Sequence, residues 1–311
     1  MRLKECFWLW GQDTMSHQRA QGNAKWKLPD GNQLDPAAGA EYLGIPNVCR
    51  VVMCGSPQPP FDDESRKLAA MHKVVWSAIG DSGSTRNDKE TDLEEVLRQA
   101  KLFPNVKGAV FDDFFGHFLQ PEEHWARYSV GDVLKIREKL HNAQNGPLDL
   151  WVVWYKRGLE YPIDDYLKAF DVITYWNMET PAEHAELQDD LARMVERTPG
   201  KRRLTGCYIW NYGAGRPLTV PEIRFECESF HDMIKKGKSE GIIFCSNCCA
   251  DIGGPAVEWL RGWIREAGEE EISQVTLALS AFYRTTLNKG RTWISLRLAL
   301  QNIQAYVQLQ L

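Results

Sequence analysis

Eight short apolar runs, each rich in β-branched and aromatic residues, recur along this chain and constrain its fold more than any other feature. They cover residues 6–11, 50–54, 73–79, 108–115, 150–155, 171–177, 204–210 and 241–246. Each run is almost continuously apolar, whereas a strand with one wet face alternates between apolar and polar residues. The pattern therefore predicts strands that are covered on both faces, as in a parallel sheet.

Helical segments are predicted between most of these runs. Ser129 has the position of an N-cap residue, and Pro221 and Gly237 flank another segment as expected for the two ends of a helix. The predicted helices cover residues 37–43, 91–102, 129–141, 164–169, 181–198, 220–236 and 255–267. Strands that alternate with helices pair in parallel through right-handed crossovers, and eight such units close into a (β/α)8 barrel.

The barrel is predicted to span residues 1–266 as one domain, with residues 267–311 as a C-terminal extension of different composition. No acidic residue follows Glu271 in this extension. Apolar residues alternate with polar ones on both sides of the turn-like sequence 288–290, which indicates a β-hairpin. A hairpin needs a partner surface. We expect it to pack on the barrel, to pair with another subunit in a homo-oligomer, or to begin a further β-domain.

Charge and composition narrow the expected partners and location. The net charge of -5 and the pI of about 5.9 argue against a nucleic-acid partner, because phosphate binding needs a basic surface. No run approaches the ~20 apolar residues of a membrane span, and the apolar stretch 6–10 is too short for a signal peptide. Most of the 8 cysteines lie in apolar runs, as buried free thiols do. We therefore expect a reducing, cytoplasmic location.

The strongest chemical signal is a pair of acidic residues in the fourth run. In barrels of this type the working residues follow the C-terminal ends of the strands, which is where Asp112 and Asp113 stand. Burying a carboxylate without a partner is unfavourable. Because side chains alternate along a strand, we expect one of the two to face the barrel mouth and the other a neighbouring strand or helix. The functional interpretation is a catalytic acid or nucleophile, and the alternative is a strand-end cap for the next loop.

Glu179 is the candidate for a second catalytic carboxylate. It follows the sixth run, and hydrolysis of a glycosidic bond uses two carboxyl groups on either side of that bond. The alternative is a surface residue at the start of the next helix, where the helix dipole favours Glu. Asp13 and Asp81, near the ends of the first and third runs, compete for the same role.

Aromatic and polar side chains near the same strand ends favour a carbohydrate ligand. The apolar faces of sugar rings stack on aromatic rings, and sugar hydroxyls need polar partners. The alternative is that the 12 tryptophans of the chain simply fill its core. The predicted substrate-binding residues are Trp10, His17, Asp81, Trp154, Tyr155, Trp176, Asn177, Trp210, Tyr212 and Asn247.

Three of these strand ends resemble those of glycoside hydrolase-like α/β barrels, and the resemblance covers roughly residues 5–266. They read GAVFDDFF at 108–115, TYWNME at 174–179 and GCYIWNYG at 206–213. The resemblance implies that an Asp of the fourth strand carries the reaction in an aromatic-lined mouth. The fourth run departs from the chitinase-type pattern, which spaces several acids along the strand and ends in Glu. No defined family follows, and a substrate-assisted chitinase mechanism is not supported.

These features predict a glycoside hydrolase that cleaves an O-glycosidic bond by paired-carboxylate acid/base chemistry, without a cofactor. One alternative is a metal-dependent sugar isomerase, epimerase or lyase, which would need several converging His and acid ligands where the rim offers His17. Another is a barrel that binds carbohydrate without catalysis. Cys245, Cys248 and Cys249 have spacings that zinc could use, but no second pair stands nearby, so we interpret them as structural thiols and expect no metal site.

Overall fold

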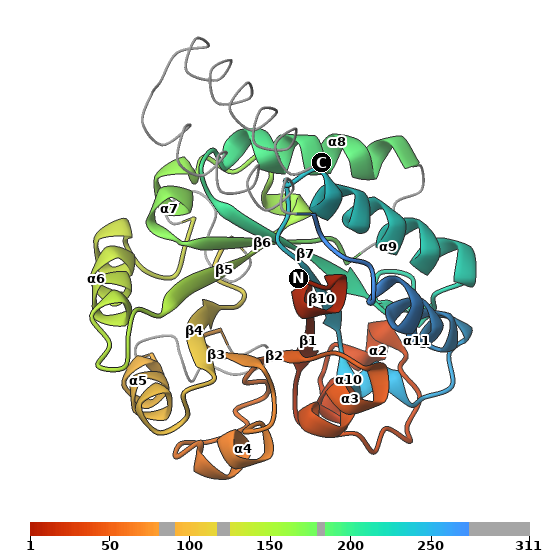
Figure 1. Cartoon of the computed structure of the whole chain (residues 1–311), viewed down its shortest axis with the longest axis horizontal. Coiled ribbons are helices and arrows are strands. Elements are labelled where there is room, and N and C mark those ends of the chain that lie inside the picture. The colour runs from red at the N-terminus through yellow and green to blue at the C-terminus, as the bar shows by residue number, and fades with distance from the viewer. Residues whose placement is uncertain (81–90, 117–124, 179–183, 274–311) are drawn as a thin grey trace.

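In a computed structural model of the chain, eight parallel strands close into a barrel that is surrounded by helices (Figure 1). The structure describes residues 1–80, 91–116, 125–178 and 184–273. Around the barrel the strands follow the order β1, β10, β7, β6, β5, β4, β3 and β2. Their bounds are Phe7–Gly11 (β1), Asn47–Arg50 (β2), Lys73–Ile79 (β3), Val106–Phe111 (β4), Asp149–Tyr155 (β5), Val172–Trp176 (β6), Arg202–Tyr208 (β7) and Ile242–Cys245 (β10). The predicted (β/α)8 barrel is confirmed.

Helices follow each strand and cover the outside of the barrel (Figure 1). The Ser129 hydroxyl accepts a hydrogen bond from the Asp132 amide and so caps α6, as the sequence predicted. Thr219 and Glu222 form a capping box at the start of α9. The described helices are Leu3–Cys6 (η1), Ser16–Arg19 (α1), Asn23–Trp26 (α2), Pro36–Leu43 (α3), Asp62–Lys67 (α4), Leu93–Leu102 (α5), Val130–His141 (α6), Lys156–Gly158 (η2), Asp164–Ala169 (α7), His184–Arg197 (α8), Val220–Lys235 (α9), Asn247–Ala250 (α10) and Pro255–Ala267 (α11).

The second strand begins and ends earlier than the predicted run at 50–54. Asn47 is fully buried at the start of β2, and its side-chain amide donates hydrogen bonds to the carbonyl oxygens of Glu5 (3.0 Å) and Phe7 (2.8 Å). These bonds satisfy the side-chain N–H donors of Asn47, so a polar residue can open a buried strand. Past Arg50 the chain leaves the ladder, and Met53 pairs with Ser56 across a turn.

The barrel interior is filled by tryptophans in two layers along the axis. Near the N-terminal ends of the strands, Trp8 packs edge-on against Trp151, with ring centroids 4.9 Å apart. Near the C-terminal ends, Trp10 packs against Trp176 at 5.0 Å. Trp8 and Trp10 both point inward because side chains two positions apart on a strand share a face. The two tryptophan layers separate the N-terminal end of the barrel from its C-terminal mouth.

A small antiparallel hairpin, β8 (Trp210–Asn211) with β9 (Arg216–Pro217), follows β7. Beyond α11, Glu271 forms a bridge with Arg2, and the Ile272 amide donates to the Met1 carbonyl oxygen at 2.9 Å. The predicted C-terminal hairpin lies outside the described residues, so the division into a barrel and an extension stays a prediction. In the part of the chain that is described, no helix is both long and apolar enough to cross a membrane.

Candidate active site

The end of β4 brings Asp112 and Asp113 into one cavity at the C-terminal mouth of the barrel. The strand stops at Phe111, and the Asp113 amide donates a 2.9 Å hydrogen bond to Oδ1 of Asp112. Asp113 has a φ of 44°, in the left-handed region that non-glycine residues seldom adopt. The expectation that the two side chains diverge is therefore wrong: strand alternation has ended, the backbone turns, and both residues line the same cavity.

Aromatic side chains form much of the wall of this cavity, which has a volume of about 140 Å³. Trp10 rises from β1 and rests on Trp176, whose ring centroid lies 5.3 Å from that of Tyr208. The aromatic lining residues are Trp10, Trp26, Tyr155, Tyr208 and Tyr212. Carboxylates beside flat apolar surfaces are the combination that a sugar ring requires of its binding site.

Tyr155, the last residue of β5, is hydrogen-bonded through its side chain to Asp113. Burial raises the pKa of the Tyr155 phenol well above its ordinary range, and the negative charges of Asp113 and Asp112 raise it further. The phenol therefore keeps its proton and donates a hydrogen bond to the Asp113 carboxylate. The Arg157 guanidinium lies 4.6 Å from the centroid of the Tyr155 ring and adds a cation to the same wall.

His17 lies on α1, in the wall formed by the loop after β1. Its Nδ1 is 2.6 Å from the Tyr212 hydroxyl, which is also 3.0 Å from Sγ of Cys249. Burial lowers the pKa of His17 to about 3, so the imidazole is neutral at physiological pH. A neutral imidazole held through one nitrogen can offer the other to a ligand.

The structure places six of the predicted site residues in the cavity. They are Asp112, Asp113, Trp10, His17, Tyr155 and Tyr212. Trp176 lies beneath them against Trp10, and Asn177 follows β6 outside the lining. Glu179 and Asp81 lie outside the described residues. Asp13, the further acidic candidate, forms an ion pair with the buried Arg50 and accepts a hydrogen bond from Ser56.

Trp154, predicted to bind substrate, faces away from the cavity. It is fully buried against the outer helices, its Nε1 donates to the Gly158 carbonyl oxygen at 2.9 Å, and Arg197 lies over its ring. On β5 the inward positions are those of Val153 and Tyr155, so alternation directs Trp154 outward. The predicted position of Trp154 in the substrate site is wrong, because the sequence pattern does not show which residues of β5 point into the barrel.

Trp210 and Asn247 also lie outside the cavity lining and hold its walls in place. The Trp210 indole donates to the Trp26 carbonyl oxygen at 2.8 Å. The Asn247 side chain accepts from the Gln12 amide and donates to the Gln12 carbonyl oxygen, both at 2.8 Å. These bonds connect the ends of β7 and β10 to the loop after β1. Trp210 and Asn247 therefore hold the backbone of that loop in position.

Several lining residues were not identified from the sequence. Tyr208 has the inward phase of Leu204 on β7, and a correct register would have found it. Trp26 comes from α2, inside the long first loop, where no local pattern marks it. The other lining residues not predicted are Gln12, Met53, Arg157, Met178 and Cys245.

The cysteines near the mouth make separate contacts. Sγ of Cys248 lies 3.3 Å from the Asp13 carbonyl oxygen and 3.4 Å from the Ser16 hydroxyl, while Cys249 contacts Tyr212. Among the described residues, no group of three or more His, Cys, Asp or Glu side chains is arranged to hold a metal ion.

No protein-family model and no curated protein matches this sequence. Solved structures do match. A "putative alpha-L-fucosidase" from Bacteroides thetaiotaomicron has a TM-score of 0.52 at 13% identity, over 87% of this chain and 97% of its own. A GH18 chitinase from Flavobacterium johnsoniae has a TM-score of 0.49 at 12% identity, over 84% and 94% of the two chains. The first match shows a shared fold. The chain therefore has a (β/α)8 barrel fold that is similar to that of this "putative alpha-L-fucosidase".

Proposed function

We propose that this protein is a glycoside hydrolase that cleaves an O-glycosidic bond at the C-terminal mouth of the barrel. The observation that carries the proposal is the convergence of Asp112 and Asp113, which are 5% and 9% exposed, in one aromatic-lined cavity. Hydrolysis by paired carboxyl groups needs one group that donates a proton and one that carries negative charge.

The contacts of the two residues divide these roles. The Tyr155 phenol, which keeps its proton, is hydrogen-bonded to the Asp113 side chain. We therefore assign Asp112 as the proton donor and Asp113 as the charged group. Glu179 follows Met178, a residue of the cavity lining, and stays a proposed further carboxylate of the reaction.

The walls supply the other requirements of a sugar site. Trp10, Trp26 and Tyr208 offer flat faces for stacking on a sugar ring, and His17 and Arg157 offer polar atoms for its hydroxyls. The substrate is thus a carbohydrate in this proposal.

The test is hydrolysis of a panel of aryl glycosides and glycans by the wild type and by D112N, D113N, E179Q and the D112N/D113N double variant. We expect the wild type to turn over at least one substrate and the double variant to lose turnover. D112N should keep part of its activity on aryl glycosides with good leaving groups, because these need little protonation. D113N should be inactive on all of them.

The matched control is D165N on α7, since the side chain of Asp165 is 80% exposed and does not line the mouth cavity. It should behave as the wild type, and circular dichroism should show that every variant is folded. A folded wild type that hydrolyses nothing, or a double variant with full turnover, contradicts the proposal. Saturable sugar binding without product would indicate a binding barrel.

A further inference from the structure

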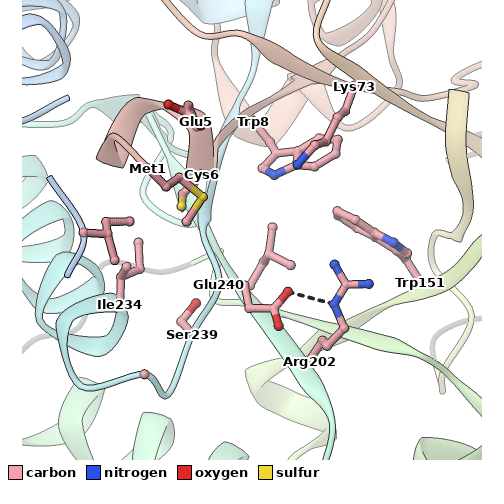
Figure 2. A pocket seen from close by; sticks show the side chains of 13 residues that line it. Met1, Glu5, Cys6, Trp8, Lys73, Trp151, Arg202, Ile234, Ser239 and Glu240 are labelled. Carbon is pink, nitrogen blue, oxygen red and sulfur yellow. Dashed lines mark hydrogen bonds and ion pairs between the residues drawn. The ribbon is translucent and has the colours of Figure 1, made fainter. Parts of the chain in front are cut away.

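A second cavity, of about 190 Å³, lies at the opposite, N-terminal end of the barrel (Figure 2). Trp8 and Trp151, the lower tryptophan layer, lie on one side of it, and Ile234 and Glu240 lie on the other. None of its lining residues belongs to the mouth cavity. The two cavities are separated by the tryptophans of the barrel interior.

Three strands of this end each place in the cavity wall a hydrogen-bond donor that has no acceptor among the described residues. Lys73 of β3 makes no hydrogen bond or ion pair to the described residues. The Nε1 atom of Trp151 on β5 is buried without a hydrogen-bond partner. Arg202 of β7 uses Nε on Glu240 and Nη1 on Asp149, which leaves Nη2 without a hydrogen bond. A buried donor without an acceptor is unfavourable, so the Trp151 indole favours an acceptor that enters the cavity, and the partly exposed Lys73 and Arg202 line the same space.

Lys73 is the cation of the cavity wall that has no acidic partner among the described residues. Of the two acidic lining residues, Glu240 is paired at 2.7 Å with Arg202, which also pairs with Asp149, and Glu5 lies 4.0 Å from Nε of Arg2. The ammonium group of Lys73 has no such compensation. An oxyanion placed beside Lys73 would gain a charge-assisted hydrogen bond, and those are stronger than neutral ones.

We propose that this cavity is a binding site for a small organic anion, a carboxylate or phosphate attached to a body the size of one ring. Lys73, Trp151 and Arg202 would donate to its oxygens, and the Trp8 and Ile234 side chains would contact its apolar part. The volume agrees, because a cavity of ~150 Å³ is enough for benzene. The site is independent of the glycosidase proposal, since it shares no residue with the mouth.

The test is a titration of the full chain with benzoate, phenyl phosphate and the neutral benzyl alcohol, measured by calorimetry and by the indole N–H signals in ¹⁵N spectra. We expect saturable 1:1 binding of at least one anion and a shift of the Trp151 indole signal. Whichever anion binds more tightly identifies the oxyanion. K73M and W151F should each weaken binding about tenfold, which corresponds to ~1.4 kcal/mol. W151F keeps an aromatic ring and removes the N–H donor together with the five-membered part of the indole.

The matched control is K107M, because Lys107 is exposed on β4 and does not line this cavity. It should bind the anion as the wild type does, and so should D112N/D113N, which alters only the mouth. Absence of saturable binding to the folded wild type would overturn the proposal. So would unchanged affinity in K73M, equal affinity for benzyl alcohol, or loss of binding in D112N/D113N.

Discussion

Gly80 lies directly against the backbone of Asp112. A Cβ atom on residue 80 would come 1.9 Å from the Asp112 carbonyl oxygen, and Gly80 has a φ of +91°, which other residues seldom adopt. In the same place the Asp112 amide donates to the Ile79 carbonyl oxygen at 2.8 Å. The end of β3 therefore determines where the proposed proton donor sits.

Gly80→Ala should displace Asp112 and abolish the proposed turnover, with a loss of ~1–3 kcal/mol in the free energy of unfolding from backbone strain and overlap. Urea denaturation and the glycoside assay measure the two effects. The control is Gly146→Ala, because Gly146 has a similar φ of +108° but no atom within 4 Å of an added Cβ. It should lose stability and keep activity. Wild-type turnover in Gly80→Ala would contradict this account.

Trp26 and Trp154 should respond to substitution in opposite ways. Trp26 is half-buried in the cavity wall, so Trp26→Ala should raise KM for the substrate or weaken sugar binding, by about tenfold for one lost stacking contact of ~1.5 kcal/mol. Trp154 is fully buried outside the barrel, so Trp154→Ala should cost about 3–5 kcal/mol of folding stability. Trp154→Phe, a milder change, should fold and bind with unchanged KM. A raised KM in Trp154→Phe with an unchanged KM in Trp26→Ala would reverse the assignment.

Glu226 should make the fold less stable at alkaline pH. It is buried between α9 and β7, with an oxygen 3.6 Å from Sγ of Cys207, and burial raises its pKa from 4.5 to about 8. The unfolded chain loses this proton near pH 4.5 and the folded chain only near pH 8. The contribution of Glu226 to the free energy of unfolding is therefore fully present below pH 4.5. It is lost as the pH rises from 4.5 to 8, by about 3–5 kcal/mol in all.

Glu226→Gln removes this titration, so its stability relative to the wild type should rise between pH 5 and pH 9. Chemical denaturation at a series of pH values measures the difference. Glu228→Gln is the control, because Glu228 is exposed on the same helix. A difference between Glu226→Gln and wild type that does not vary with pH would show that Glu226 is ionised in the fold.

His17 should produce the opposite dependence. Its pKa falls from 6.5 to about 3 in the fold, so the folded chain resists protonation that the unfolded chain accepts. The stability from the neutral ring is present above pH 6.5 and is lost as pH falls to 3, by about 3–5 kcal/mol. His17→Gln should flatten this part of the stability profile, whereas His72→Gln, at an exposed position, should not. An unchanged slope in His17→Gln would contradict a neutral His17.

The sequence alone determined the fold class and the location of the candidate chemistry. Continuous apolar runs and helix-end signals are local properties, and they predicted the barrel, the Ser129 cap and the placing of Asp112 and Asp113 at the end of the fourth strand. These predictions are correct because the apolar run of a strand and the cap of a helix can each be recognised within a few neighbouring residues.

Only the tertiary structure decided which side chains meet. The phase of β5 directs Tyr155 into the mouth and Trp154 away from it, and one residue of register reverses that choice. Trp26 reaches the wall from a loop without regular pattern, and the left-handed turn at Asp113 brings two adjacent carboxylates into one cavity. These arrangements depend on contacts between segments far apart in the chain, which a local pattern does not contain.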